Sequence, residues 1–175
     1  MDSSLSPSPD LEPNWFVKKV GENLTRVVAL DPGETTGVAV FEGPRKLYED
    51  QLTTKDVPAA AKRLAEMIDA WGAKVVVCED YRVYAWKIRQ HAWSSLHTPR
   101  LIGAIELVCH VGGILLVKQS AQVAKTFCTD EKLDQWGVNS DRRHSRDAIR
   151  HACYYLLFGK EKPNESQTHS GQVES

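Results

Sequence analysis

The chain has 175 residues, of which 42% are hydrophobic and 26% are charged, and its formal net charge is -1 at pH 7. This length and composition are typical of one globular domain, so they exclude a chain that is disordered throughout. Because the net charge is close to zero, no global positive field points to a nucleic-acid partner, and only the local distribution of charge can indicate one.

The sequence predicts an intracellular, soluble protein. No window approaches the roughly 18 to 20 uninterrupted apolar residues that a membrane-spanning helix needs. The N-terminal segment MDSSLSPSPDLEPN is acidic and rich in Pro and Ser, without the basic start and apolar stretch of a secretory signal. The cysteines are widely spaced in apolar segments and form no CxxC pair, which predicts reduced, buried thiols and no zinc site: Cys78, Cys109, Cys128 and Cys153.

Polar segments flank the patterned part of the chain. Residues 1–22 and 160–175 are predicted to be flexible tails, and residues 23–159 are predicted to form one domain without internal repeats. At the start of this domain, alternating apolar residues predict strands over 25–30 and 36–42. The sequence DPGET should join them as an antiparallel hairpin, and a third strand is predicted over 46–52.

The period of the apolar residues then changes from two to 3.6. A helix is predicted from Val57 to Trp71, with Asp56 as its cap, Pro58 in its first turn and Gly72 at its end. It is followed by KVVVC at 74–78, a β-branched run typical of a strand that is buried on both faces.

The second half of the domain predicts helices around one more strand. Residues 81–97 show no clear pattern apart from a possible helix from residue 83, and a clearer helix covers 98–111. A fifth strand over 113–117, a short helix after Ser120, a polar connection over 130–141 and a final helix over 142–158 complete the domain. This order predicts a mixed α/β sheet with helices on both faces.

Carboxylates follow two of the predicted strands. Asp31 ends the first strand, Glu79 ends the fourth, and a short right-handed crossover would set these two strands side by side and parallel. In the final helix, His144, Asp147 and His151 are three and four residues apart, so they share one face. Each position alone has a simpler explanation as a turn former or a solvated residue, but the topology would gather them at one edge of the sheet.

This set of side chains has the chemistry of a site for hard divalent cations. Mg²⁺ prefers a few carboxylate oxygens and keeps several waters. Two such ions, roughly 3.5 to 4 Å apart, can activate water on one side of a phosphodiester and stabilise the leaving oxygen on the other. The residues therefore predict metal-assisted phosphodiester hydrolysis.

Four segments taken in order resemble one known family. The pattern ALDPGETTGVAVF, VVCEDY, KQSAQVAKTF and HSRDAIRHACYYL resembles the RuvC family of Holliday junction resolvases within the RNase H-like superfamily, as a divergent phage-type member. The resemblance spans residues 25–158. It implies an RNase H-like mixed five-stranded sheet, with the first three strands antiparallel and the others parallel, in a protein of a bacterial or phage-infected host cytoplasm.

The resemblance also implies roles for individual residues. Asp31, Glu79 and Asp147 match the three catalytic acids of the family, which bind two Mg²⁺ or Mn²⁺ ions per active site. The family has a further metal-site residue three positions before the last aspartate, and here that residue is His144, as a ligand or as a base that orients the attacking water. Asp141, one helical turn earlier, is a fallback acid.

The implied substrate is branched DNA, above all the four-way junction of recombination and repair. A homodimer would cut two opposed strands and leave 5′-phosphate and 3′-hydroxyl ends, since two-fold pairing suits the symmetry of that substrate. The family's short motif after the strand-four glutamate is not reproduced in DYRVYAWKIRQHAW, so Tyr81, Tyr84 and Trp86 all stay open as the side chain that stacks in the junction.

Local charge supports a DNA-binding surface. Between residues 81 and 129 the only acid is Glu106, and aromatic residues interleave with cations, as expected where bases stack and phosphates are neutralised. The alternative for the aromatic residues is packing into a core or a dimer interface. The predicted DNA-binding residues are Tyr81, Arg82, Tyr84, Trp86, Lys87, Arg89, Arg100, Lys118, Lys125, Arg142 and Arg143.

Two other functions are compatible with parts of the sequence. DPGETTG also resembles the first phosphate loop of actin-like ATPases and sugar kinases, although those proteins need a second related domain and further Gly-rich loops that this sequence lacks. The other is a catalytically inactive module that binds branched DNA. Such a module would be expected to lack one of the three acids, and all three are present.

Overall fold

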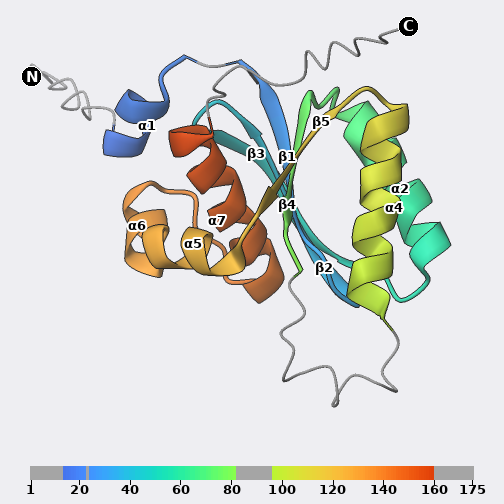
Figure 1. Ribbon diagram of the computed structural model, residues 1–175. Helices are drawn as coiled ribbons and strands as arrows, with labels where there is room; N and C mark the ends of the chain where they lie inside the picture. The colour runs from blue at the N-terminus through green and yellow to red at the C-terminus, as the bar shows by residue number, and fades with distance from the viewer. Residues whose placement is uncertain (1–13, 23, 82–95, 160–175) are drawn as a thin grey trace, which may run out of the picture.

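The computed structural model describes residues 14–22, 24–81 and 96–159 of the chain. These residues form a central sheet with helices on both faces (Figure 1). The sequence predictions for residues 1–13, 82–95 and 160–175, including the possible helix from residue 83 and the C-terminal tail, lie outside the described residues.

The sheet has five strands in the order β3-β2-β1-β4-β5. β1 pairs with β2, and β2 with β3, in antiparallel register, whereas β4 runs parallel to both β1 and β5. This confirms the predicted mixed sheet and its DPGET hairpin. The strands are β1 (Arg26–Asp31), β2 (Thr35–Glu42), β3 (Arg45–Thr53), β4 (Val75–Glu79) and β5 (Leu115–Gln119).

The helices divide between the two faces of the sheet (Figure 1). On one face, α2 (Val57–Ala70) and α4 (His97–Val111) pack against each other and against the sheet. The other face carries α7 (Arg143–Phe158) directly on the sheet, with three shorter helices around it: α1 (Trp15–Val20), α5 (Ala121–Phe127) and α6 (Asp130–Gln135).

The signals that the sequence carries for α2 are all used in the structure. The Asp56 side chain accepts a hydrogen bond from the backbone N–H of Ala59 at 3.0 Å, so it satisfies a donor that the first turn leaves free. Gly72 follows the helix with φ of 59°, a left-handed conformation that Gly adopts without steric cost. The helix therefore ends where the next strand must begin.

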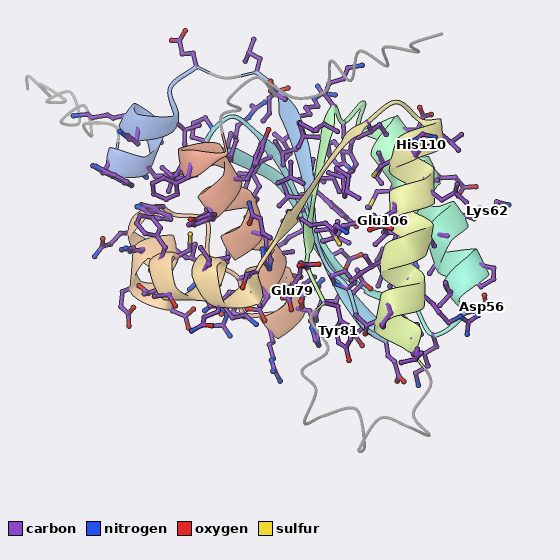
Figure 2. All side chains as sticks on the ribbon, in the orientation of Figure 1. Asp56, Lys62, Glu79, Tyr81, Glu106 and His110 are labelled. Atoms are coloured by element: carbon purple, nitrogen blue, oxygen red, sulfur yellow. The ribbon has the colours of Figure 1, made fainter. Side chains whose placement is uncertain are left out.

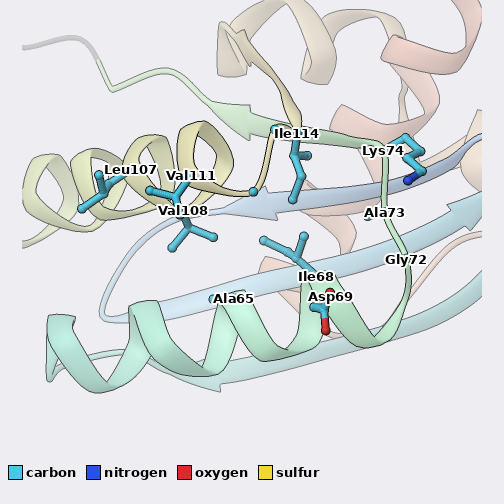
Figure 3. A pocket seen from close by; sticks show the side chains of 12 residues that line it. Ala65, Ile68, Asp69, Gly72, Ala73, Lys74, Leu107, Val108, Val111 and Ile114 are labelled. Atoms are coloured by element: carbon cyan, nitrogen blue, oxygen red, sulfur yellow. The ribbon is translucent and has the colours of Figure 1, made fainter.

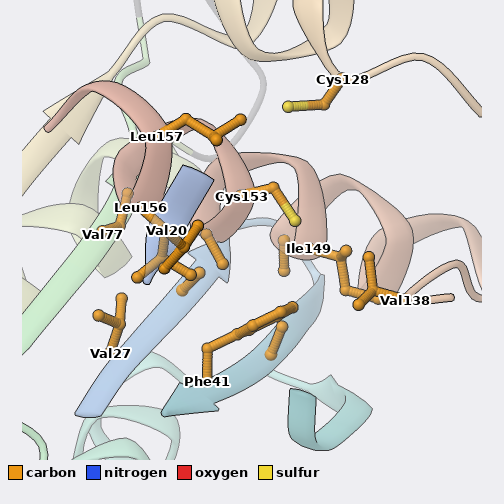
Figure 4. Packing of buried hydrophobic residues seen from close by; sticks show 14 of the residues in the cluster. Val20, Val27, Phe41, Val77, Cys128, Val138, Ile149, Cys153, Leu156 and Leu157 are labelled. Atoms are coloured by element: carbon orange, nitrogen blue, oxygen red, sulfur yellow. The ribbon is translucent and has the colours of Figure 1, made fainter. Parts of the chain in front are cut away.

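Small residues let α7 lie close to the sheet. Ala148, Ala152 and Cys153 are fully buried, while Ile149 and Leu156 fill the space around them (Figure 4). Burial of a side chain of the size of Ile or Leu stabilises the fold by about 1.5 to 3 kcal/mol. The position of α7, and with it that of His144 and Asp147, is thus fixed by a well-packed core.

Two helices occur where the sequence analysis predicted none. α1 lies inside the predicted N-terminal tail, because Phe16 and Val20 are buried and the Asn14 side chain donates a hydrogen bond to the Trp136 carbonyl at 3.1 Å. α6 lies in the predicted polar connection and buries Leu133. Both helices are six residues long, which is too short for a periodic apolar pattern to be recognised.

Two further sequence predictions concern the cysteines and membrane-spanning helices. All four cysteines are buried and free, as expected. Within the described ranges, no helix has both the length and the apolar character needed to cross a membrane.

Candidate active site

One row of residues crosses all five strands at the edge where the parallel strands end. Asp31 on β1 pairs with Gly37 on β2, which pairs with Gln51 on β3. On the other side, Glu79 on β4 pairs with Gln119 on β5, and the register of β1 with β4 sets Asp31 beside Glu79. Because neighbours in register point to the same face, the side chains of this row all lie under α7.

The first turns of α7 cross this row and contact it at successive strands. The backbone N–H of His144 donates to the Gln51 side chain at 3.1 Å, and His144 Nδ1 lies 2.8 Å from Asp31 Oδ2. Farther along the helix, His151 Nε2 lies 3.3 Å from Glu79 Oε2. The helix therefore touches both strand-end carboxylates, as the spacing of its polar residues predicted.

The close approach of α7 requires a glycine on β2. A Cβ atom built on Gly37 would lie 1.9 Å from the His144 carbonyl oxygen, a distance that no real contact allows. Gly37 thus makes room for the backbone of His144 above the sheet. This explains why a small residue interrupts an otherwise apolar, β-branched strand.

Asp31 and Glu79 differ in their electrostatic surroundings. Burial raises the pKa of Asp31 to about 6, although the hydrogen bond from His144 lowers it, and the nearby charges of Glu79 and Asp147 raise it further. Burial also acts to raise the pKa of Glu79, but the hydrogen bond and charge of His151, together with the charge of Lys125, outweigh it, and the pKa is lowered.

Asp147 reaches the same region from the middle of α7. It is 5% exposed, and its two oxygens are held by cations: Lys125 Nζ lies 3.1 Å from Oδ2, and Arg150 contacts Oδ1. Its charge acts on Asp31. The four residues predicted for the site, Asp31, Glu79, His144 and Asp147, therefore come together at one edge of the sheet.

The donor set of this site fits a hard divalent cation. The negative charges of Asp31, Glu79 and Asp147 lie close together in a largely buried site, where a cation would neutralise them. Carboxylate oxygens are also the ligands that Mg²⁺ and Mn²⁺ prefer. Among the residues that the structure describes, however, no three His, Cys, Asp or Glu side chains already form a closed metal cluster. The oxygens of Asp147 are instead held by the ion pairs with Lys125 and Arg150.

The predicted DNA-binding residues fall into three groups. Lys125 lies at the site itself, and Arg142 is at the N-terminal end of α7, where it pairs with Asp50 at 2.8 Å. Arg100 and Arg143 are exposed at the N-terminal ends of α4 and α7, while Lys118 pairs with Glu106 at 2.7 Å. Apart from Tyr81, the remaining predicted residues lie outside the described part of the chain: Arg82, Tyr84, Trp86, Lys87 and Arg89.

Tyr81 is the described member of the aromatic set. It is 37% exposed and follows Glu79 at the end of β4 (Figure 2). Together with Glu79, Pro32, Thr98 and Ile102 it lines a hollow of about 190 Å³. The Tyr81 side chain therefore lies beside Glu79, on the side of the site that faces α4.

A cavity of about 470 Å³ lies at the opposite edge of the sheet, between the C-terminal ends of α2 and α4 (Figure 3). It is lined mainly by apolar side chains such as Ile68, Leu107 and Val111, with Asp69 and Lys74 at its margin. This cavity is therefore separate from the carboxylates.

Three residues at the site received no role from the sequence. His151 shares the face of His144 and Asp147, but only the structure shows that it contacts Glu79. Gln119 is a polar residue at the end of the third parallel strand, at the same edge as Asp31 and Glu79. Its position at a strand end is the signal that could have predicted it. Arg150 follows Asp147 by three residues on the same helix, and this i,i+3 spacing is a signal that could have predicted the ion pair between them.

Comparison with known proteins gives a clear result for structure and none for sequence. No protein-family model and no curated protein matches the sequence. Among solved structures, Thermus thermophilus RuvC in complex with a Holliday junction substrate matches with a TM-score of 0.63 and 16% identity, over 77% of this chain and 94% of that one. This chain has the RuvC fold.

Two further solved structures agree with that result. A second Thermus thermophilus RuvC structure matches with a TM-score of 0.59 and 16% identity, over 77% of this chain and 95% of that one. The yeast mitochondrial Holliday junction resolvase Ydc2 matches with a TM-score of 0.50 and 10% identity, over 81% and 83% of the two chains. The RuvC-like, RNase H-like architecture expected from the sequence motifs is thereby confirmed.

Proposed function

We propose that this protein is a metal-dependent endonuclease that cleaves Holliday junctions and related branched DNA. The observation that carries the proposal is the meeting of Asp31, Glu79, His144 and Asp147 at the carboxyl edge of a RuvC fold. These residues are far apart in sequence, and the structure gives each of them at least one other charged or polar partner at the site. The neighbour with the same fold is bound to a Holliday junction substrate.

The cations would be two Mg²⁺ or Mn²⁺ ions held by Asp31, Glu79 and Asp147. Bound there, they would supply charge stabilisation of the scissile phosphate and an activated water. Asp31, whose pKa is raised to about 6, would bind the cation in its ionised form, and Asp147 would exchange Lys125 for a cation. Lys125, whose side chain is 42% exposed, would then be free to neutralise a phosphate of the DNA.

His144 has two possible duties in this proposal. Its Nδ1 contacts Asp31 and its side chain is 37% exposed, so it reaches both the carboxylates and solvent. It would either complete the donor set or accept a proton from the attacking water. His144→Asn would place a neutral amide oxygen near the position of Nδ1, which could complete the donor set but could not accept a proton at neutral pH.

The DNA would lie across the edge of the sheet, between the N-terminal ends of α4 and α7. Arg100, Arg142 and Arg143 are exposed at or next to these helix ends, and contacts of such side chains with phosphates recognise shape rather than sequence. We also propose a homodimer, because two sites related by a two-fold axis match the symmetry of a four-way junction.

The proposal is tested by incubating the purified protein with a labelled four-way junction, a flap, a duplex and single-stranded DNA, with and without Mg²⁺. Symmetric nicks in the junction that require the cation are the expected result. Equal loss of all four substrates would instead identify a general nuclease. Nucleotide hydrolysis without any cutting would favour the actin-like ATPase alternative, and junction binding without cutting at any cation concentration would favour an inactive module.

The carboxylates are tested by Asp31→Asn and Glu79→Gln. Each change keeps the size of the side chain and removes the charge that holds a cation, so we expect cleavage to fall at least about 100-fold. Junction affinity, measured in the presence of Ca²⁺ or a chelator, should stay within about three-fold, since the basic residues are unchanged. Retained turnover in both variants would end the two-metal hypothesis.

A further inference from the structure

His151 is a fully buried polar residue on the face of α7 that packs against the sheet. It is 0% exposed, lies one helical turn after Asp147, and is flanked on the helix by Ala148 and Ala152, which are also fully buried. Burial of an imidazole is costly unless its nitrogens are hydrogen-bonded. Both are: Nδ1 lies 3.1 Å from Gln119 Oε1, and Nε2 lies 3.3 Å from Glu79 Oε2.

The partners of the ring fix the direction of these hydrogen bonds. A carboxylate oxygen only accepts, so His151 Nε2–H must donate to Glu79. The amide of Gln119 can serve Nδ1 in either protonation state, because its carbonyl accepts from an N–H and its amino group donates to a bare nitrogen. The proton on Nε2 is therefore required by the Glu79 carboxylate, and Gln119 holds the other side of the ring through Nδ1.

Gln119 is itself held in place at the edge of the sheet. It is the last residue of β5, it pairs with Glu79 across the parallel ladder, and its backbone carbonyl accepts a hydrogen bond from Asp80 N–H at 2.7 Å. The chain Gln119–His151–Glu79 thus connects three elements, β5, α7 and β4. It approaches Glu79 from the side of β5, whereas Asp31 meets Glu79 from the side of β1.

From this geometry we propose that His151, oriented by Gln119, is a positioning residue that fixes the Glu79 carboxylate for cation binding. The inference rests on the proposed function of the site. His151 has no access to solvent, so it acts through Glu79 and does not touch the DNA or the attacking water. His144 differs in this respect, because its side chain is partly exposed and contacts Asp31 directly.

The test compares two substitutions of His151 with a matched control. His151→Gln keeps an N–H close to the position of Nε2, whereas His151→Leu fills a similar volume without a donor. Cys153→Ala is the control, because this residue is fully buried in the same helix and packs in the core on the α7 face of the sheet. All three variants should lose some thermal stability, but only His151→Leu should lose the hydrogen bond to Glu79.

The main measurement is the affinity of the DNA-free protein for Mn²⁺, followed by the paramagnetic signal of the free ion. We expect His151→Leu to bind Mn²⁺ about 10- to 100-fold more weakly than the wild type, which is the usual effect of removing a residue that orients a metal ligand. His151→Gln and Cys153→Ala should stay within about three-fold of the wild type. In junction cleavage, the Mg²⁺ concentration for half-maximal rate should rise by a similar factor in His151→Leu alone.

Wild-type Mn²⁺ affinity in a folded His151→Leu variant would overturn the inference and leave the proposed function intact. If the wild type itself binds no Mn²⁺, both the proposed function and this inference fail. Should His151→Leu not fold, the same measurement on Gln119→Leu decides the matter. Gln119 lies at the end of an edge strand, where a substitution should disturb folding less. The Gln119→Leu variant should also bind Mn²⁺ more weakly if the Gln119–His151 pair positions Glu79.

Discussion

Asp31 is held in a state that is unfavourable for a lone carboxylate. It is 8% exposed, and its neighbours include two further carboxylates, Glu79 and Asp147. Without a cation, burial and this repulsion hold the pKa of Asp31 at about 6. Such a strained arrangement is common at active sites, where stability is lost in exchange for binding.

This state predicts how stability depends on pH at the level of one residue. Because the pKa of Asp31 is raised from its ordinary value of 3.8 to about 6, the folded protein binds a proton more tightly than the unfolded chain does. The contribution of this proton is complete below pH 3.8 and is lost as the pH rises through about 6. The difference between these values corresponds to at most about 3 kcal/mol.

We therefore expect Asp31→Asn to be more stable than the wild type at pH 7.5 when both proteins are treated with a chelator. At pH 3 the two free energies of unfolding should be nearly equal, because Asp31 is then mostly protonated in both the folded and the unfolded wild type. Urea unfolding across this pH range measures the difference between the proteins. Two parallel stability curves would contradict the raised pKa of Asp31.

At the level of elements, the site depends on how closely α7 lies on β2. Gly37→Ala would bring a Cβ atom into the His144 carbonyl, so the first turn of α7 would have to move. We expect a loss of about 1 to 3 kcal/mol in the free energy of unfolding, as for other overpacked sites. We also expect junction cleavage to fall at least ten-fold, since His144 would lose its contact with Asp31.

Gly103→Ala is the control for this substitution. Gly103 lies within α4, where an added Cβ would meet no atom within 4 Å. Because Gly is less favourable than Ala inside a helix, this variant should gain about 0.5 to 1 kcal/mol and cleave normally. Wild-type stability and activity in Gly37→Ala would show that α7 does not need the close approach.

The sequence predicted the elements that carry long patterns, and it missed those that depend on packing. The strand-end positions of Asp31 and Glu79 followed from two apolar runs and a parallel crossover, which are local signals with one consistent topology. Helix α1 is six residues long and depends on a contact between Asn14 and Trp136, residues 122 positions apart. No periodicity over so few residues reveals such a contact.

The same distinction holds within the candidate site. The identity of its acids could be predicted, because strand ends and helix faces are visible in the sequence. The ion pairs of Asp147 with Lys125 and Arg150, and the contact of His151 with Gln119, depend on side-chain conformations across three elements. These contacts decide the electrostatics of the site, and only the folded structure gives them.

At the scale of the whole molecule, the net charge is only -1, and exposed cations lie at both edges of the sheet. Arg143 is exposed at the start of α7, beside the carboxylates, whereas Lys74 is exposed at the opposite edge, just before β4. Arg143→Glu and Lys74→Glu alter the net charge equally, so they separate local contact from overall field.

We expect Arg143→Glu to weaken junction binding about ten-fold at low salt and to reduce its dependence on salt concentration, because a contact with phosphate is lost. Lys74→Glu should change the affinity less than about two-fold. Fluorescence anisotropy with a labelled four-way junction over a series of salt concentrations measures both effects. Equal weakening by the two variants would mean that the junction responds only to net charge and has no defined place at the carboxyl edge.

The order of the elements along the chain has a consequence for biosynthesis. The strands bearing Asp31 and Glu79 leave the ribosome well before α7, whose residues 144–151 supply the histidines and the third acid. A nascent polypeptide that has emerged only as far as β5 holds two acids without their partners. Nuclease activity would therefore be absent during most of translation, and would arise only when the helix emerging late closes over the finished sheet.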